Sequence, residues 1–151
     1  RGTIAGHDLR LLIPETFINE SGRSVAAMAR YYRIEPDAIL IAHDELDIPP
    51  GESRFKCDGG HGGHNGLRDI IPALGGHRDF WRLRVGIGHP GSAKKVSDWV
   101  LSKASAADQA AIEASTVAAI SALPLLLDGE DLKAMTALHS ESYAAQPSQE
   151  D

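Results

Sequence analysis

The chain has 151 residues and a mass of 16.1 kDa, and 42% of its residues are hydrophobic and 24% charged. These values are typical of one ordinary globular domain rather than two. The single cysteine, Cys57, excludes an internal disulfide and gives no indication of an oxidising compartment. We therefore expect one soluble α/β domain, located in the cytoplasm.

The net charge of -6 is distributed unevenly along the chain. Residues 54–103 carry a net charge of +5, whereas residues 104–151 carry -7 and residues 1–53 carry -4. Because binding depends on the local field, an acidic protein with a basic middle can still attract a polyanion. The alternative is that these charges only solvate the faces of strands and helices.

The first predicted elements are two strands, Gly2–Ile4 and Leu9–Pro14, around a turn at residues 5–8. A chain that opens with Arg1 in the middle of a hairpin has the appearance of a fragment whose first strand and helix are missing. A helix is expected over Arg23–Tyr32. Its predicted core positions have helical spacing and are Val25, Met28, Ala29 and Tyr32.

The apolar run Ala38–Ala42 predicts a buried strand, which is expected to be parallel. It is followed by the polar residues His43, Asp44 and Glu45, and in open α/β sheets ligands and catalytic groups collect at the carboxyl ends of strands. The alternating segment Ser53–Lys56 predicts an edge or half-exposed strand.

Five glycines lie within the nine residues of Asp58–Gly66, directly before a predicted helix at residues 67–74. Glycines allow positive φ and close backbone approach, and a helix start favours anions, so this loop is suited to binding an anion or a sugar edge. His61 and His64 could instead hold zinc together with His43 and Asp44. The flexible loop makes a poor cage, and we expect no metal or other cofactor.

A strand at Trp81–Ile87 and a helical turn at Asp98–Leu101 come next. A long helix over Ala107–Leu127 follows, with Ile112, Val117 and Ile120 expected on one stripe and Pro124 expected to bend it or end its regular part. Its most apolar stretch, residues 118–127, is too short to span a membrane. A last helix is expected over Asp131–Leu138, and the polar tail, residues 140–151, is expected to be disordered.

Asp44 is the strongest single candidate for chemistry, because a desolvated carboxylate at a strand end requires a hydrogen-bonding partner or a cation. A histidine polarised by such an aspartate becomes a general base. Taken alone, Asp44 could be a loop-capping carboxylate, and Asn19 and His64-Asn65 could simply start helices.

Taken together, these residues resemble bacterial peptidyl-tRNA hydrolases. The resemblance runs from about Leu9 to Leu138. The segments that carry it are PETFINESG at Pro14–Gly22, HDELDIPPG at His43–Gly51, GGHGGHNGLRDI at Gly59–Ile70, RLRVGIGHPG at Arg82–Gly91 and VLSK at Val100–Lys103.

The resemblance implies hydrolysis of the ester between a peptide and the 3′ ribose of tRNA. In that family an aspartate matching Asp44 orients a general-base histidine. Residues matching Asn19 and Asn65 hold the substrate and the attacking water or the oxyanion. The position of Phe17 lines the site near the tRNA end, and that of His64 shapes the same cleft. The residues matching a basic surface for tRNA phosphates are Arg54, Lys56 and Arg84.

The general-base histidine of the family lies upstream of the residues printed here, and no histidine of this chain takes its place. His43 precedes Asp44 on the same strand and is expected to point to the opposite face. We therefore expect the chain as printed to be inactive or nearly so. An inactive relative of the same fold that only binds RNA or a partner is the alternative function, and a metal-dependent hydrolase built on His61 and His64 is another.

The expected fold is a single α/β domain with a mixed, largely parallel twisted sheet and helices on both faces. The domain is expected to span residues 1–139, without its N-terminal part, and to be a monomer whose partner is peptidyl-tRNA. No membrane is expected to take part.

Overall fold

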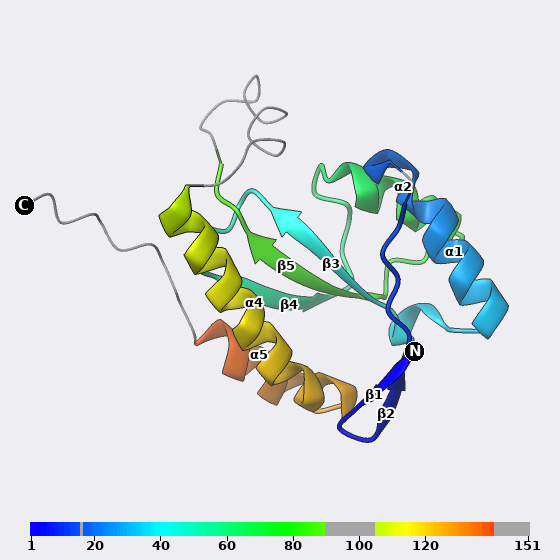
Figure 1. Cartoon of the computed structure of the whole chain (residues 1–151). Coiled ribbons are helices and arrows are strands. Elements are labelled where there is room, and N and C mark those ends of the chain that lie inside the picture. Colours follow the sequence, from blue (N-terminus) through cyan, green and yellow to red (C-terminus); the bar gives the residue numbers. More distant parts are fainter. Residues whose placement is uncertain (16, 90–104, 141–151) are drawn as a thin grey trace, which may run out of the picture. The chain divides into compact units, whose positions relative to one another are not determined.

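The computed structural model describes residues 1–15, 17–89 and 105–140 (Figure 1). The chain divides into two compact units. Unit 1 comprises Arg1–Ile41 and Lys56–Arg82, and unit 2 comprises Ala42–Phe55 and Leu83–Asp151. The predicted turn at residues 98–101, the VLSK segment and residues 141–151 of the predicted disordered tail lie outside the described residues. The elements in chain order are β1 (Gly2–Ile4), β2 (His7–Leu9), η1 (Ile18–Glu20), α1 (Ser21–Tyr32), η2 (Pro36–Ala38), β3 (Leu40–Glu45), β4 (Ser53–Cys57), α2 (Asn65–Ala73), β5 (Trp81–Gly86), α4 (Ala106–Leu127) and α5 (Asp131–His139).

The central feature is a three-stranded sheet in the order β3-β5-β4. The amides of Trp81 and Ile87 donate to the carbonyls of Ile39 and Glu45, a constant offset that makes β3 and β5 parallel. The amides of Asp58 and Gly86 donate to the carbonyls of Phe80 and Glu52. Residue numbers on β5 rise as those of their partners on β4 fall, so β4 and β5 are antiparallel. The predicted α/β fold with a mixed sheet is confirmed.

Unit 1 is built around the apolar faces of α1 and α2, which lie side by side (Figure 1). Its buried cluster consists of Val25, Leu67, Ile70 and Phe80. Close approach of the helices depends on Gly22: a Cβ there would lie 2.4 Å from the carbonyl oxygen of Asp69. The Gly22 amide donates to Asp69 Oδ2 at 2.6 Å, so Asp69 holds the first turn of α1 against α2.

Unit 2 contains α4 and α5, which pack against each other. The buried face of α4 consists of small residues, Ala111, Ser115, Ala119 and Ala122. Ser115 accepts a hydrogen bond from the Ser53 hydroxyl of β4 at 2.9 Å and donates to the carbonyl of Ile112, so its buried hydroxyl is satisfied.

The prediction for the core stripe of α4 was therefore wrong, because Val117 and Ile120 are 62% and 60% exposed. The small-residue face forms the interior because alanine and serine let the helix approach β4 and α5 closely. Pro124 does not end the helix either: the Asp128 amide donates to the Pro124 carbonyl, which closes the last turn. The whole helix is long and apolar enough, by length and composition alone, to cross a membrane, with a hydropathy of 1.8 over its most apolar window.

Two predictions near the start of the chain also needed correction. The second strand is His7–Leu9 rather than Leu9–Pro14, because Ala5 and Gly6 both have positive φ and form a tight two-residue turn between β1 and β2. Tyr32 is 44% exposed rather than in the core, and the guanidinium of Arg10 lies 3.9 Å above its ring.

The predicted strand Ala38–Ala42 is shifted in the structure. Ala38 belongs to η2, whose turn begins at Pro36, and β3 extends to Glu45. Leu40 and Ala42 are exposed and Ile41 is half-buried, so the burial alternates instead of being continuous. His43 and Asp44 both belong to β3, as expected for two neighbours on one strand, and Glu45 is its last residue.

Candidate functional site

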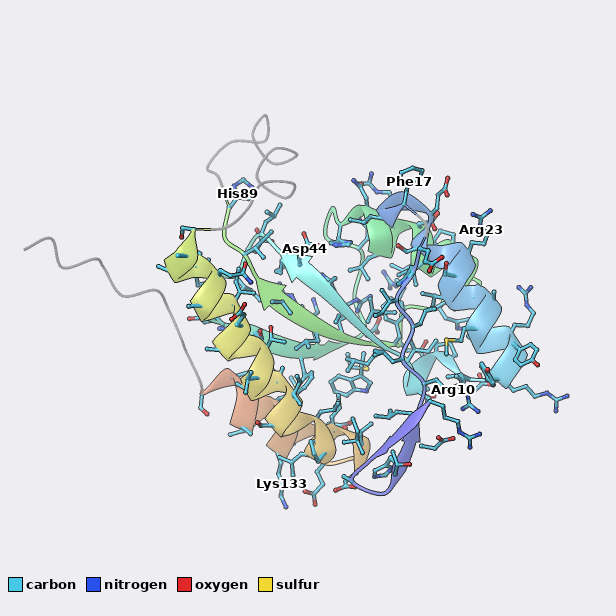
Figure 2. All side chains as sticks on the ribbon, in the orientation of Figure 1. Arg10, Phe17, Arg23, Asp44, His89 and Lys133 are labelled. Carbon is cyan, nitrogen blue, oxygen red and sulfur yellow. The ribbon has the colours of Figure 1, made fainter. Side chains whose placement is uncertain are left out.

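In unit 1, η1 and the first turn of α2 bring together the segments that carry four of the predicted site residues. Phe17 directly precedes η1 and is 78% exposed, projecting outward in Figure 2. Asn19 belongs to η1, and η1 packs against α2, which begins with Asn65. A Cβ at Gly66 would lie 3.4 Å from Ile18 Cγ2, so the absence of a side chain there lets η1 approach the start of α2.

His64 is the N-cap of α2. Its Nδ1 accepts the amide hydrogen of Leu67 at 3.2 Å, which satisfies one of the amides that a helix start leaves without an intrahelical partner. In the neutral ring the proton is then on Nε2. A Cβ at Gly66 would lie 2.9 Å from Cε1 of this ring, so the glycine also makes room for the imidazole. His64 therefore starts the helix, as one of the sequence alternatives proposed.

The glycine-rich loop before His64 is held at its base by Arg82, which is 2% exposed. The guanidinium donates to the carbonyl oxygens of Asp58 and Gly59, with a distance of 2.6 Å for the second bond, and it lies 4.4 Å above the ring of Phe80. Sequence reasoning missed this role for Arg82. The available indication was an arginine between the apolar residues Trp81 and Leu83 of a predicted strand, since a buried arginine must have hydrogen-bonding partners.

The loop itself is ordered by two further contacts with its own backbone. Asp58 has a φ of 64°, and its Oδ1 accepts the amide hydrogen of Gly59 at 2.6 Å. His61 Nδ1 accepts the amide hydrogen of Gly63 at 2.9 Å. Both predicted zinc-binding histidines thus use Nδ1 to hold the backbone. Within the described residues, no three His, Cys, Asp or Glu side chains are grouped so that they could hold a metal ion.

Asp44 is half-buried and lies near the carboxyl end of β3 in unit 2 (Figure 2). Its main-chain carbonyl accepts a hydrogen bond from His43 Nδ1 at 2.8 Å, which fixes the proton of that ring on Nδ1. The predicted site residues therefore fall into two groups, with Phe17, Asn19, His64 and Asn65 in unit 1 and Asp44 in unit 2.

The three predicted phosphate-binding residues have different environments. Arg84 donates from Nε (2.9 Å) and Nη2 (2.5 Å) to Glu45 Oε1, and only 24% of its side chain is exposed. Arg54 is 48% exposed and lies 3.8 Å from Glu52, a looser pair. Lys56 is exposed. Sequence reasoning did not foresee the role of Glu45, which joins β3 to β5 through Arg84.

His139, the last residue of α5, attaches that helix to β4. Its Nε2 accepts the amide hydrogen of Phe55 at 3.1 Å. Burial and then the positive charge of Arg54 lower the pKa of His139 below its ordinary value. The neutral ring is the form that can accept this hydrogen bond.

Comparison with known proteins identifies the fold. The crystal structure of peptidyl-tRNA hydrolase from Acinetobacter baumannii superposes with a TM-score of 0.90 at 50% identity, covering 95% of this chain and 72% of that one. The peptidyl-tRNA hydrolase of Pseudomonas putida is 59% identical over 136 residues, which are 90% of this chain and 70% of that protein. The corresponding enzyme of Psychrobacter cryohalolentis is 59% identical over 139 residues, or 92% and 71% of the two chains.

The fold is of the α/β class, and the relatives that the chain matches are hydrolases. The family model for peptidyl-tRNA hydrolase matches residues 1–146, and the chain belongs to this family. Its reaction is the hydrolysis of the ester that joins a peptide to the 3′ ribose of tRNA, and peptidyl-tRNA is its substrate. The family predicted from the sequence motifs is confirmed.

Proposed function

We propose that Asp44 is the base-orienting carboxylate of this ester hydrolase. The supporting observation is its place on β3, half-buried near the carboxyl end of a strand that pairs in parallel with β5. A carboxylate in such a place holds an imidazole in one tautomer and stabilises the imidazolium that forms when the imidazole takes a proton from water. The water then attacks the ester carbonyl, and the tRNA 3′ oxygen leaves.

The general base itself is expected to be a histidine other than those of these 151 residues. This expectation comes from the family resemblance, and four of the seven histidines have a structural contact of their own. His64 caps α2, His61 orders the glycine loop, His43 donates to the carbonyl of Asp44, and His139 accepts from β4. Each ring is already held in place by a contact with the main chain.

Asn65 and Asn19 are proposed to hold the ester end of the substrate and the attacking water or the developing oxyanion. Asn65 is exposed at the first position of α2, where the amides of the helix start favour negative charge. Exposed Phe17 supplies an apolar surface for the tRNA end. His64 shapes this site by fixing the start of α2.

Arg54 and Lys56, both exposed on β4, are proposed to bind tRNA phosphates. Arg84 remains a candidate for the same surface, although two of its donor groups are used by Glu45. We further propose that the protein is a cytoplasmic monomer that acts without a metal and without a membrane. For the last point, the support is that four small residues of α4 lie in the core of unit 2, with 22% of the most apolar window of the helix buried.

The test is hydrolysis of an N-blocked aminoacyl-tRNA by the chain, with and without added imidazole. We expect slow turnover alone and a saturable increase with imidazole, because the small base can occupy a place beside Asp44. Asp44→Asn should lose this increase. Asp47→Asn, an exposed carboxylate beyond β3, is the matched control and should keep it. A chelator should change nothing.

Fast turnover without imidazole would contradict the assignment of the base, and His43 or His64 would then have to be that base. Loss of turnover with a chelator would support the metal-dependent alternative. Tight RNA binding without turnover in either condition would support the inactive relative.

A further inference from the structure

A groove in unit 1 lies between the glycine-rich loop and the second half of α2. It has a volume of about 490 Å³, within the usual range for small-ligand sites, and it is open to solvent. The residues that matter for its chemistry are Gly60, His61, Arg68, Ile71, Pro72 and Arg78. Of the residues considered in the sequence analysis, His61 and the glycine-rich loop line it, whereas Asp44, Asn19 and Asn65 do not.

The groove is positively charged and its lining contains no acidic residue. Among the residues that the structure describes, no carboxylate lies within ion-pair distance of Arg68 or Arg78, both of which are exposed. Asp69, the neighbour of Arg68 in sequence, has its Oδ2 engaged by the amide of Gly22 on α1. The two guanidinium charges are therefore available to an external anion.

The loop side of the groove is preorganised to donate hydrogen bonds. Because His61 Nδ1 accepts from the Gly63 amide, the neutral ring carries its proton on Nε2. Arg82 fixes the carbonyls of Asp58 and Gly59, directly before Gly60. At the start of the same loop, Lys56 Nζ would lie 3.2 Å from a Cβ at Gly59, which extends the positive charge toward β4.

The opposite wall is apolar, formed by Ile71 and Pro72. Two forked guanidiniums, an imidazole N–H and an apolar wall together match a phosphate with its attached sugar. We propose that this groove binds one backbone phosphate of the tRNA substrate, with the adjoining ribose against Ile71 and Pro72. The proposal rests on tRNA being the substrate and adds a phosphate contact beyond those assigned to Arg54 and Lys56.

The test is the double variant Arg68→Gln/Arg78→Gln, measured by fluorescence anisotropy with an RNA hairpin that carries a single-stranded 3′ end. Losing one phosphate contact should reduce the slope of log affinity against log salt by about 0.7–0.9. At about 0.1 M salt, we expect an affinity loss of roughly tenfold, as for about one charge-assisted contact. The matched control is Arg23→Gln, an exposed arginine of α1 paired with Glu20, which should leave the slope unchanged.

A slope in the double variant equal to that of Arg23→Gln would overturn the proposal. Titration with inorganic phosphate, followed by the His61 ring resonances, separates the possible sources of the anion. Phosphate binding without any effect of the double variant on RNA would make the groove a small-anion site and would also overturn the proposal.

The variant Arg54→Gln/Lys56→Gln keeps this result distinct from the proposed tRNA surface on β4. If it weakens RNA binding while Arg68→Gln/Arg78→Gln does not, only the groove assignment fails. If neither variant changes RNA binding, both phosphate assignments fail.

Discussion

The two units of this protein place their polar groups in different ways. In unit 1, the side chains that order the glycine-rich loop and the start of α2 bond to main-chain groups, as with His64 on Leu67 and Arg82 on Gly59. In unit 2, Arg84 and Glu45 form an ion pair between the side chains of two strands, while His43 and His139 bond to main-chain groups. Unit 1 thus preorganises amides and rings that can hold a substrate, whereas unit 2 holds charged groups in fixed positions on a sheet.

The largest loss of stability is expected at one glycine in each unit, where the lack of a side chain lets neighbouring backbone segments pack closely. A Cβ at Gly22 would lie 2.4 Å from the Asp69 carbonyl in unit 1, and one at Gly86 would lie 2.3 Å from the Pro49 carbonyl in unit 2. Because backbone atoms cannot move aside cheaply, Gly22→Ala and Gly86→Ala should each lower the free energy of unfolding by about 1–3 kcal/mol.

Chemical denaturation measures this loss. Gly2→Ala is the control, since nothing lies within 4 Å of its Cβ position. Equal stability of all three variants would show that the helix and strand approaches described here are not tight.

The next effect distinguishes the two arginines of unit 2. Arg84→Gln leaves Glu45, whose side chain is only 16% exposed, without its strongest partner, so we expect a loss of about 1–2 kcal/mol in unfolding free energy. Arg54→Gln breaks a looser, exposed pair and should change stability by less than about 0.5 kcal/mol. Thermal unfolding of both variants provides the measurement, and a larger loss for Arg54→Gln would reverse this ranking.

The smallest effect is a pH dependence in unit 2. The pKa of His139 is lowered in the folded chain, so the unfolded chain binds the proton more readily. The stability that His139 contributes is therefore fully present above the ordinary histidine pKa and is lost as the pH falls through the lowered pKa. His139→Gln should reduce the dependence of stability on pH across this window, and an unchanged dependence would contradict the role given to its bond with Phe55.

Much of the fold could be predicted because local sequence determines it. The turn chemistry and periodicity placed α1, α2, β4 and β5 within a few residues of their observed bounds. The buried face of α4 could not be read in this way, because alanine and serine at Ala111, Ser115 and Ala119 become interior only through β4 and α5. Periodicity favours the larger residues Val117 and Ile120, which the structure leaves exposed.

The sequence indicated the residues of the candidate site but not their contacts. The motifs indicated the family and the residues that carry its chemistry, but a motif does not show what each side chain touches. The pairing of Arg84 with Glu45, the anchoring by Arg82 and the use of Asp69 to hold Gly22 all join residues distant in sequence. Such contacts depend on the packing of whole elements, and spacing along one chain does not reveal them.

The central claim is that Asp44 of unit 2 serves the proton transfer, whereas Asn65 of unit 1 holds the substrate. The most direct test compares Asp44→Asn with Asn65→Ala in imidazole-supported hydrolysis, with tRNA binding measured separately. We predict that Asp44→Asn lowers kcat by about 10²–10⁴ with tRNA affinity within about twofold, because it removes the orientation of the base. Asn65→Ala should raise KM, by about three- to tenfold for one lost hydrogen bond. Equal loss of hydrolysis and of tRNA binding in Asp44→Asn would contradict the account.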